Sequence, residues 1–428
     1  MYNNMLDYFF MYSKFKVWFR KTRLGNWYFS RNRKTPKGKG QNNKQPLFNL
    51  NLLKYFKFSS KRNLVIVLSL FFTIFIGFNL FIYFSIEPKT IFSSKAEITE
   101  IYDEGEKNIL LVGISSEGGY SYIDLIQVLT LDLIEESANL YSISPLTSSI
   151  DYTNLDSNIQ LKSVFNNNLE QPELKVMDLR NNIETMLSLR IDRYVIFETA
   201  DFVEYITADN QLYKDIGSTE LANYYFNDHN TSVKEVNKRQ LKLISDFIDD
   251  NSSSYNQYFN LFLKNKELTD LFRTDMTRNE LISFVQSFKF ISSNIRTYNL
   301  NLDEILVKEV YTPLELNQKY IFETIKEAEK ETIIITEQAG IEVYNDTQIK
   351  GLANKIANRL EVKGAAILRP ANYVMDDEDE NILYVVGDEE RYANTVDLIR
   401  RELRGNVIIS EDEYKFNHTG DLILILAD

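Results

Sequence analysis

The chain has 428 residues, of which 44% are hydrophobic and 13% are aromatic, and its formal net charge is −13. It contains no cysteine, which excludes disulfide bonds, thiol catalysis and metal sites built from thiolates. A chain of this length and composition is expected to form more than one packed core.

Residues 64–86 form an apolar stretch of 23 residues without a charged side chain. As a helix this stretch would extend about 34 Å, compared with roughly 30 Å for the hydrocarbon core of a bilayer. A buried helix of a soluble domain is the alternative, but such helices are rarely apolar on every side over several turns. We therefore predict a single transmembrane helix at residues 63–86.

The charge on the two sides of this stretch predicts its orientation. Residues 1–62 contain fifteen Lys and Arg but one acidic residue, Asp7, whereas the rest of the chain has 33 basic and 60 acidic residues. Because basic segments stay in the cytoplasm, we expect a single-pass plasma-membrane protein with a cytoplasmic N-terminus and residues 87–428 outside the cytoplasm. The negative external part argues against nucleic acid as its partner.

Aromatic and basic side chains alternate through residues 8–29 of the basic arm. This pattern is typical of segments that lie on an anionic membrane surface, so we predict the inner leaflet as a partner of the arm. Basic and aromatic stretches also bind nucleic acid, which is the alternative. Residues 87–106, which begin with Glu87-Pro88, are expected to form a short stalk.

Three strands are predicted after the stalk, at residues 108–114, 124–131 and 139–144. A loop at 115–122 with two glycines separates the first two strands, and such a loop alone is weak evidence for phosphate binding. In sequence and order, the three segments resemble the LytR-CpsA-Psr family of envelope proteins, whose motifs read roughly NILLLGxD, SDTIMLxSI and LSIPRDT.

Further segments resemble the motifs of that family in the same order, so that the likeness covers about residues 107–302. They are residues 161–165, 191–197, 202–203, the pair Arg239-Gln240 and residues 271–281. The resemblance implies an α/β sandwich on a mixed sheet outside the membrane. It also implies transfer of a glycopolymer from a polyprenyl-pyrophosphate carrier to peptidoglycan, assisted by Mg²⁺ and by arginines that hold the pyrophosphate.

Four residues match functional positions of that family. The resemblance implies that Asp124 is catalytic and a metal ligand, that Arg239 is catalytic and binds phosphate, and that Lys162 and Gln240 bind phosphate. Arginine and carboxylate are the groups that phosphoryl transfer needs, since they neutralise phosphate and hold a hard cation. The alternatives are that Asp124 is a solvated residue at the start of a strand and that Arg239 forms an ordinary ion pair on a helix.

The chain departs from the family at several other positions. Residues 144–147 read Ser-Pro-Leu-Thr where the family has Pro-Arg-Asp-Thr, Val236 replaces an arginine, and residues 225–228 contain no arginine. Losing one stabilising donor typically lowers a rate by about 10²–10³. We therefore favour a degenerate domain, a pseudoenzyme that binds polyprenyl-linked glycopolymer or cell wall, over an active phosphotransferase, and we regard Mg²⁺ as doubtful.

Three other features are interpreted as structural. Asp192 stands at the entry to a strand, where a short polar side chain commonly caps the backbone. The two histidines, His229 and His418, are far apart in sequence and are expected at the surface. The acidic run at residues 376–380 lacks the spacing of calcium ligands and is expected to be a solvated hairpin tip.

The last part of the chain is expected to form a helical linker at 303–338, with a helix at 320–331, and a small βαββαβ domain at 339–428. Apolar residues at helical spacing predict helices around 352–360 and 392–403, and a ferredoxin-like arrangement is plausible. Residues 343–353, VYNDTQIKGLA, resemble the LytR C-terminal domain, whose role would be binding or assembly.

Overall fold

The computed structural model describes most of the chain after the expected stalk. The described ranges are 106–117, 120–149, 159–165, 172–209, 217–226, 228–252, 271–373, 380–387, 389–410, 414 and 417–427, with six residues between 69 and 77. The basic arm, most of the expected membrane span, the stalk before Glu106 and nearly all of the acidic run lie outside these residues. Among the residues described, no helix is both long enough and apolar enough to cross a bilayer.

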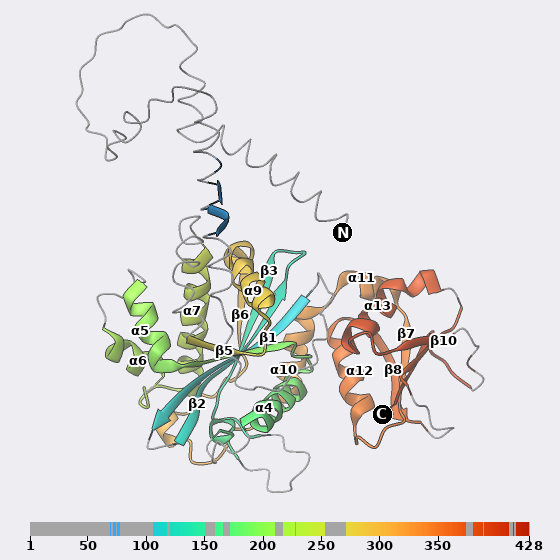
Figure 1. Ribbon diagram of the computed structural model, residues 1–428. Coiled ribbons are helices and arrows are strands. Elements are labelled where there is room, and N and C mark those ends of the chain that lie inside the picture. The colour runs from blue at the N-terminus through green and yellow to red at the C-terminus, as the bar shows by residue number, and fades with distance from the viewer. Residues whose placement is uncertain are drawn as a thin grey trace, which may run out of the picture. The chain divides into compact units, whose positions relative to one another are not determined.

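The first part of the fold is a six-stranded mixed sheet in which β1 and β2 are central (Figure 1). Its strands, in spatial order, are β5 (Phe272–Thr274), β4 (Arg193–Glu198), β1 (Glu106–Glu117), β2 (Tyr120–Asp132), β3 (Ser137–Ile143) and β6 (Ile295–Asn299). The pairs β1–β4 and β3–β6 are parallel and the other pairs are antiparallel. The three predicted strands are confirmed, but the loop expected at 115–122 is mostly extended hairpin.

Helices cover both faces of this sheet because its central strands are apolar on both sides. Ile109 and Leu111 of β1 belong to one buried cluster and Leu110 and Val112 to the other, as the alternation of side chains along a strand requires. The helices of the first cluster are α5 (Thr199–Asp209), α6 (Ser218–Tyr225), α7 (Val233–Ser252) and α9 (Arg278–Ile291); those of the second are α4 (Pro172–Leu187) and α10 (Gln318–Glu329). The predicted α/β architecture on a mixed sheet is confirmed.

The segment 271–281 owes its shape to a local signal in the sequence. The short strand β5 ends at Thr274, and Thr277 then caps helix α9. The Thr277 hydroxyl accepts a hydrogen bond from the Glu280 backbone N–H, and the Glu280 carboxylate accepts one from the Thr277 N–H. This reciprocal capping satisfies two N–H groups that the first turn of a helix leaves without partners.

The C-terminal part forms a second, five-stranded sheet. In spatial order its strands are β10 (Ile408–Ser410), β9 (Ile382–Val385), β11 (Leu422–Leu426), β7 (Gly340–Asn345) and β8 (Ala366–Asn372). The pairs β7–β8 and β9–β10 are adjacent and parallel, and β11 lies between them. The ferredoxin-like prediction is wrong, because in that fold another strand separates the two strands of each βαβ unit.

Three helices supply the apolar side chains that cover one face of the second sheet. They are α11 (Thr332–Glu337), α12 (Leu352–Val362) and α13 (Ala393–Glu402). The predicted helical faces at 352–360 and 392–403 are therefore confirmed. Gly351 precedes α12 with φ +79°, a backbone conformation that favours glycine.

Residues 303–338 do more than link the two sheets. Helix α10 buries Ile321 and Ile325 in the core of the first part, and Val307 lines a pocket described below. Helix α11 contributes Ile334 to the core of the second part. The segment was predicted to be a helical linker. Most Glu and Lys side chains of its helices are exposed or half-buried, with Glu329 as the exception, whereas apolar side chains of the same helices enter the two cores.

A buried ion cluster joins residues far apart in the sequence. The Lys363 ammonium contacts the carboxylates of Glu106 and Glu329, and the latter lies 3.1 Å away. Glu329 also accepts hydrogen bonds from the Asn139 side chain and the Tyr141 hydroxyl. Strands β1 and β3 of the first sheet, helix α10 and the end of helix α12 are thereby connected through buried polar and charged groups.

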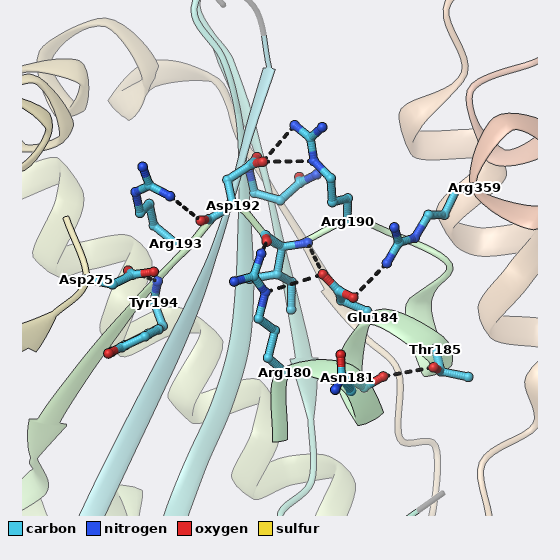
Figure 2. A network of polar contacts seen from close by, with 12 residues as sticks. Arg180, Asn181, Glu184, Thr185, Arg190, Asp192, Arg193, Tyr194, Asp275 and Arg359 are labelled. Atoms are coloured by element: carbon cyan, nitrogen blue, oxygen red, sulfur yellow. Dashed lines mark hydrogen bonds and ion pairs between the residues drawn. The ribbon is translucent and has the colours of Figure 1, made fainter. Parts of the chain in front are cut away.

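A second group of polar contacts surrounds Glu184 of helix α4 (Figure 2). Its carboxylate lies 2.7 Å from Arg359 and 3.4 Å from Arg180, and it accepts a hydrogen bond from the Ile191 N–H. Burial opposes ionisation of this carboxyl, but the nearby positive charges prevail and hold the Glu184 pKa below its ordinary value. The carboxylate therefore remains charged although the side chain is buried.

Candidate functional site

A β-bulge in the hairpin formed by β1 and β2 determines the position of Asp124. Gly113 pairs with Leu125 and Ile114 with Ile123, so that Asp124 has no opposing residue on β1. Such an extra residue bends the strand and redirects its side chain. Gly113 fits this bend because an added Cβ would lie 3.0 Å from the Thr199 methyl and 3.1 Å from Leu125.

Neighbouring side chains form hydrogen bonds with both the backbone oxygen and the carboxylate of Asp124. The Gln240 amide donates a 3.0 Å hydrogen bond to the Asp124 backbone oxygen, which the bulge leaves outside the regular ladder. The Thr199 hydroxyl lies 3.4 Å from the Asp124 carboxylate, which also has a hydrogen bond with Ser115. Burial raises the pKa of the Asp124 carboxyl, although the Ser115 bond and the charge of Lys162 act in the opposite direction.

Asp124, Lys162 and Gln240 line a surface pocket that we call the Asp124 pocket. Its lining combines polar and apolar side chains from strand β2, the segment after β3, the turn at Lys162, residues 226–229 and helix α7. The lining residues are Ile123, Asp124, Ser144, Pro145, Leu146, Lys162, Phe226, Asp228, His229, Val233, Val236, Asn237, Gln240 and Val307. Three of the four residues predicted from sequence, Asp124, Lys162 and Gln240, are brought together here.

Arg239 is absent from this lining, for a reason that follows from helix geometry. The pocket residues of α7 have the spacing of one helical face, at positions 233, 236, 237 and 240. Arg239 is rotated about 100° from Gln240. Its guanidinium donates to Asp228 at 2.8 Å and lies 4.1 Å from the centre of the Tyr224 ring. Arg239 thus positions Asp228, and the ion-pair alternative describes its contacts better than a phosphate-binding role does.

The positions where the family's arginines were expected do lie at the pocket. Pro145 and Val236 line it, and so does Asp228 from the segment 225–228. The lining therefore carries apolar and acidic groups where the resemblance implies cations. Lys162 is the only lysine or arginine among the lining residues described. Hydrogen bonds from Thr231 and Arg239 lower the pKa of Asp228, so this second carboxylate is ionised at neutral pH.

Sequence reasoning missed several lining residues. His229 was expected to be a remote surface residue; it is exposed, but it lines the pocket and its charge acts on Asp124. Phe226 and Val307 also line the pocket, and only the folded chain brings them there. A signal did exist for Asn237, because its spacing from Gln240 predicts a common helical face. His418 is half-buried and lies 3.2 Å from the Gly420 oxygen.

The donor groups around Asp124 do not fit a magnesium ion. Among the residues that the structure describes, no group of three or more His, Asp or Glu side chains could hold a metal. Asp228 is engaged by Arg239 and Thr231, and the positive Lys162 lies close enough to affect Asp124. Mg²⁺ prefers several oxygen ligands in octahedral geometry, which this lining does not supply.

Asp192 has the structural role expected for it. Its carboxylate accepts a 3.0 Å hydrogen bond from the Asn108 N–H and a 2.9 Å one from Arg190 (Figure 2). Its own N–H donates to the Asn108 oxygen at 2.8 Å. Only 3% of the residue is exposed, and these bonds fix the entry of β4 beside β1.

Comparison with known proteins identifies the C-terminal part. Residues 338–428 match the family described as LytR cell envelope-related transcriptional attenuator, so the predicted LytR C-terminal domain is confirmed. No curated protein matches the chain.

Several solved structures resemble the chain. B. subtilis TagV has 17% identity over 53% of this chain and 97% of its own, with a TM-score of 0.41. TagT bound to LIIa-WTA has 15% identity over 56% of this chain and 94% of its own, with a TM-score of 0.39. Lin1025 of Listeria innocua has 15% identity over 53% of this chain and 98% of its own, with a TM-score of 0.38. Because these TM-scores are below 0.5, no conclusion about function rests on them.

Proposed function

We propose that this chain is a membrane-anchored cell-envelope protein of LytR-CpsA-Psr type whose Asp124 pocket binds a glycopolymer or its polyprenyl-phosphate carrier without transferring it. The family's motifs, which follow one another in order through residues 107–302, support the assignment. The LytR C-terminal domain at residues 338–428 supports a role in the cell envelope. The opposite charges of the arm and the remainder support the proposed orientation, with the arm on the anionic inner leaflet.

The composition of the pocket carries the distinction between binding and transfer. Phosphoryl transfer depends on positioned cations that neutralise the developing charge. At the pocket, Leu146 and Val236 are apolar, Asp228 is acidic and Lys162 is the one lysine of the described lining. Arg239 is held by Asp228 and Tyr224. A pyrophosphate would therefore meet one ammonium, a histidine and two carboxyl groups, which is a poor match for its charge.

An active phosphotransferase is the second candidate. It is favoured by the half-buried Asp124 and by Lys162, whose charge acts on Asp124; both match family positions. If transfer occurs, Asp124→Asn removes the acidic group that the reaction would require and should abolish turnover. If the protein only binds, neither the unmodified chain nor the variant shows turnover, and the variant changes only the affinity measured in the binding assay.

The deciding experiment uses the full chain purified in mild detergent with a polyprenyl-pyrophosphate-linked glycopolymer and Mg²⁺. We expect retention of the lipid-linked polymer but no release of polymer above the buffer control. A transfer-competent family member run in parallel verifies the substrate. Robust release by this chain that disappears in Asp124→Asn would overturn the proposed binding role.

The apolar strand residues at 110–112 and 195–197 are candidates for contact with a polyprenyl chain. In the structure these strand residues are packed in the two buried clusters of the first part, and none of them lines the Asp124 pocket. Binding a long lipid there would require helices to separate from the sheet. Mass spectrometry of the detergent-purified protein tests this: a co-purifying polyprenyl phosphate would support lipid binding, and its repeated absence would limit the ligand to the polymer.

A further inference from the structure

Gln240, one of the residues that line the Asp124 pocket, carries a buried hydrogen-bond acceptor without a partner among the described residues. The residue is 1% exposed, and its Nε2 donates to the backbone oxygens of Asp124 and Tyr225 at 3.0 and 3.1 Å. Because only the NH₂ group can donate to two carbonyls, these bonds fix the orientation of the amide. The opposite atom, Oε1, is buried without a hydrogen-bond partner among the residues described.

A buried acceptor without a partner is uncommon in folded proteins and calls for an explanation. Gln240 lines the pocket together with two carboxyl groups, those of Asp124 and Asp228. The complementary ligand is one that brings hydrogen-bond donors. A phosphate or pyrophosphate presents acceptor oxygens and negative charge instead, so it would meet like charge at the carboxylates and no donor at Gln240 Oε1.

The apolar part of the lining narrows the class of ligand. Around the acceptors stand apolar side chains that include Leu146, Phe226, Val236 and Val307. A sugar ring combines both features, since its hydroxyl groups donate and its C–H faces pack on apolar side chains. A cationic amine also donates, but the positive Lys162 lines the same pocket and would repel it.

We propose that the Asp124 pocket binds an uncharged sugar unit, with one hydroxyl donating to Gln240 Oε1 and another to the Asp124 carboxylate. This inference rests on the proposed envelope function and specifies which part of a glycopolymer the pocket holds. Gln240 then has two roles: its NH₂ group stabilises the bulge at Asp124, and its oxygen determines which ligand binds.

The test measures binding to the full chain in detergent by saturation-transfer NMR and calorimetry. The probes are three uncharged oligosaccharides, chitotriose, maltotriose and cellotriose, together with inorganic pyrophosphate and free lysine. We expect at least one oligosaccharide to bind more tightly than pyrophosphate or lysine. Gln240→Lys keeps a donor for the two carbonyls and removes the acceptor, and it should weaken oligosaccharide binding by about tenfold.

Two further variants keep the test informative if Gln240→Lys fails to fold. Val236→Phe fills the pocket from a half-buried position and leaves the Gln240 amide in place, and it should also reduce oligosaccharide binding. Lys162→Met identifies a phosphate ligand, because it would remove pyrophosphate binding if phosphate were bound. Lys330→Met, whose exposed side chain is outside the pocket lining, is the control that should leave oligosaccharide binding unchanged.

The possible failures are distinguishable. Tighter binding of pyrophosphate, lost in Lys162→Met, would overturn the sugar inference and leave the proposed function intact. Tighter binding of lysine would overturn the inference in favour of an amine. If neither the probes nor the lipid-linked glycopolymer bound, both the inference and the proposed function would be refuted.

Discussion

Replacing Lys363 by methionine should strongly destabilise the protein. The Lys363 side chain is 4% exposed and it serves two carboxylates, those of Glu329 at 2% and Glu106 at 16% exposed. Methionine preserves much of the apolar stem but removes the ammonium. Two acidic groups would then be left close together in a region where water cannot solvate them.

The magnitude follows from this burial. Removing one partner of a buried ion pair typically costs about 3–5 kcal/mol, whereas an exposed pair contributes about 0–1 kcal/mol. Glu329 keeps the hydrogen bonds from Asn139 and Tyr141, which limits the loss, but Glu106 depends more on Lys363. We therefore expect Lys363→Met to lower the free energy of unfolding by about 3–5 kcal/mol above pH ~7.5.

Urea denaturation of the detergent-purified full chain, followed by circular dichroism, measures this loss. The matched control is Lys330→Met, because the ion pair of Lys330 with Glu327 is exposed, at 43% and 77%; its loss should stay below about 1 kcal/mol. Adding Glu106→Gln and Glu329→Gln to Lys363→Met should recover much of the stability. A loss below about 1 kcal/mol for Lys363→Met would refute the reasoning, because the cluster would then be effectively solvated.

Three further predictions concern the ion cluster, the bulge and the membrane topology. Burial, together with the nearby Glu329, raises the pKa of Glu106 from 4.5 to about 7. The contribution of Glu106 to the free energy of unfolding is therefore fully present below pH ~4.5, and about 3 kcal/mol of it is lost as the pH rises to ~7. Glu106→Gln should abolish this pH dependence in urea unfolding. Gly113→Ala should lower stability by about 1–3 kcal/mol and weaken ligand binding, because its methyl meets Thr199 at 3.0 Å; unchanged binding would contradict the role of the bulge. Protease added to intact cells should digest residues 87–428 and spare 1–62, and protection of the C-terminal part would refute the proposed orientation.

The arrangement of the first sheet was largely predictable from local patterns. Mostly apolar segments at 108–114 and 124–131 predict strands that are buried on both faces, and they are the central pair β1 and β2. Strand pairing in the second sheet was not predictable in this way. The strand β11 lies between β7 and β9, and sequence order contains no signal for a terminal strand that enters the middle of a sheet.

The candidate site was predictable only in part, for the same physical reason. Asp124, Lys162 and Gln240 were found because their motifs are local, and the fold brings them to one pocket. The orientation of Arg239 depends on which face of α7 meets β2, and its partner Asp228 was not recognised from sequence. Val307 could not be found at all, because the segment that carries it was predicted to be a helical linker.

A site that has only lost its phosphate-binding residues and a site adapted to another ligand should differ in how well their buried polar groups are paired. If the pocket had no ligand, the buried Oε1 of Gln240 would lack a hydrogen bond. This would lower the free energy of unfolding by about 1–3 kcal/mol, a substantial fraction of a typical value of about 5–15 kcal/mol. The same amide also holds the bulge through the Asp124 oxygen, and Arg239 holds Asp228 at the rim through a 2.8 Å ion pair. The pocket is thus a stabilised arrangement of acceptors with apolar walls, and such an arrangement is better explained by a ligand that donates hydrogen bonds than by the loss of a phosphate site.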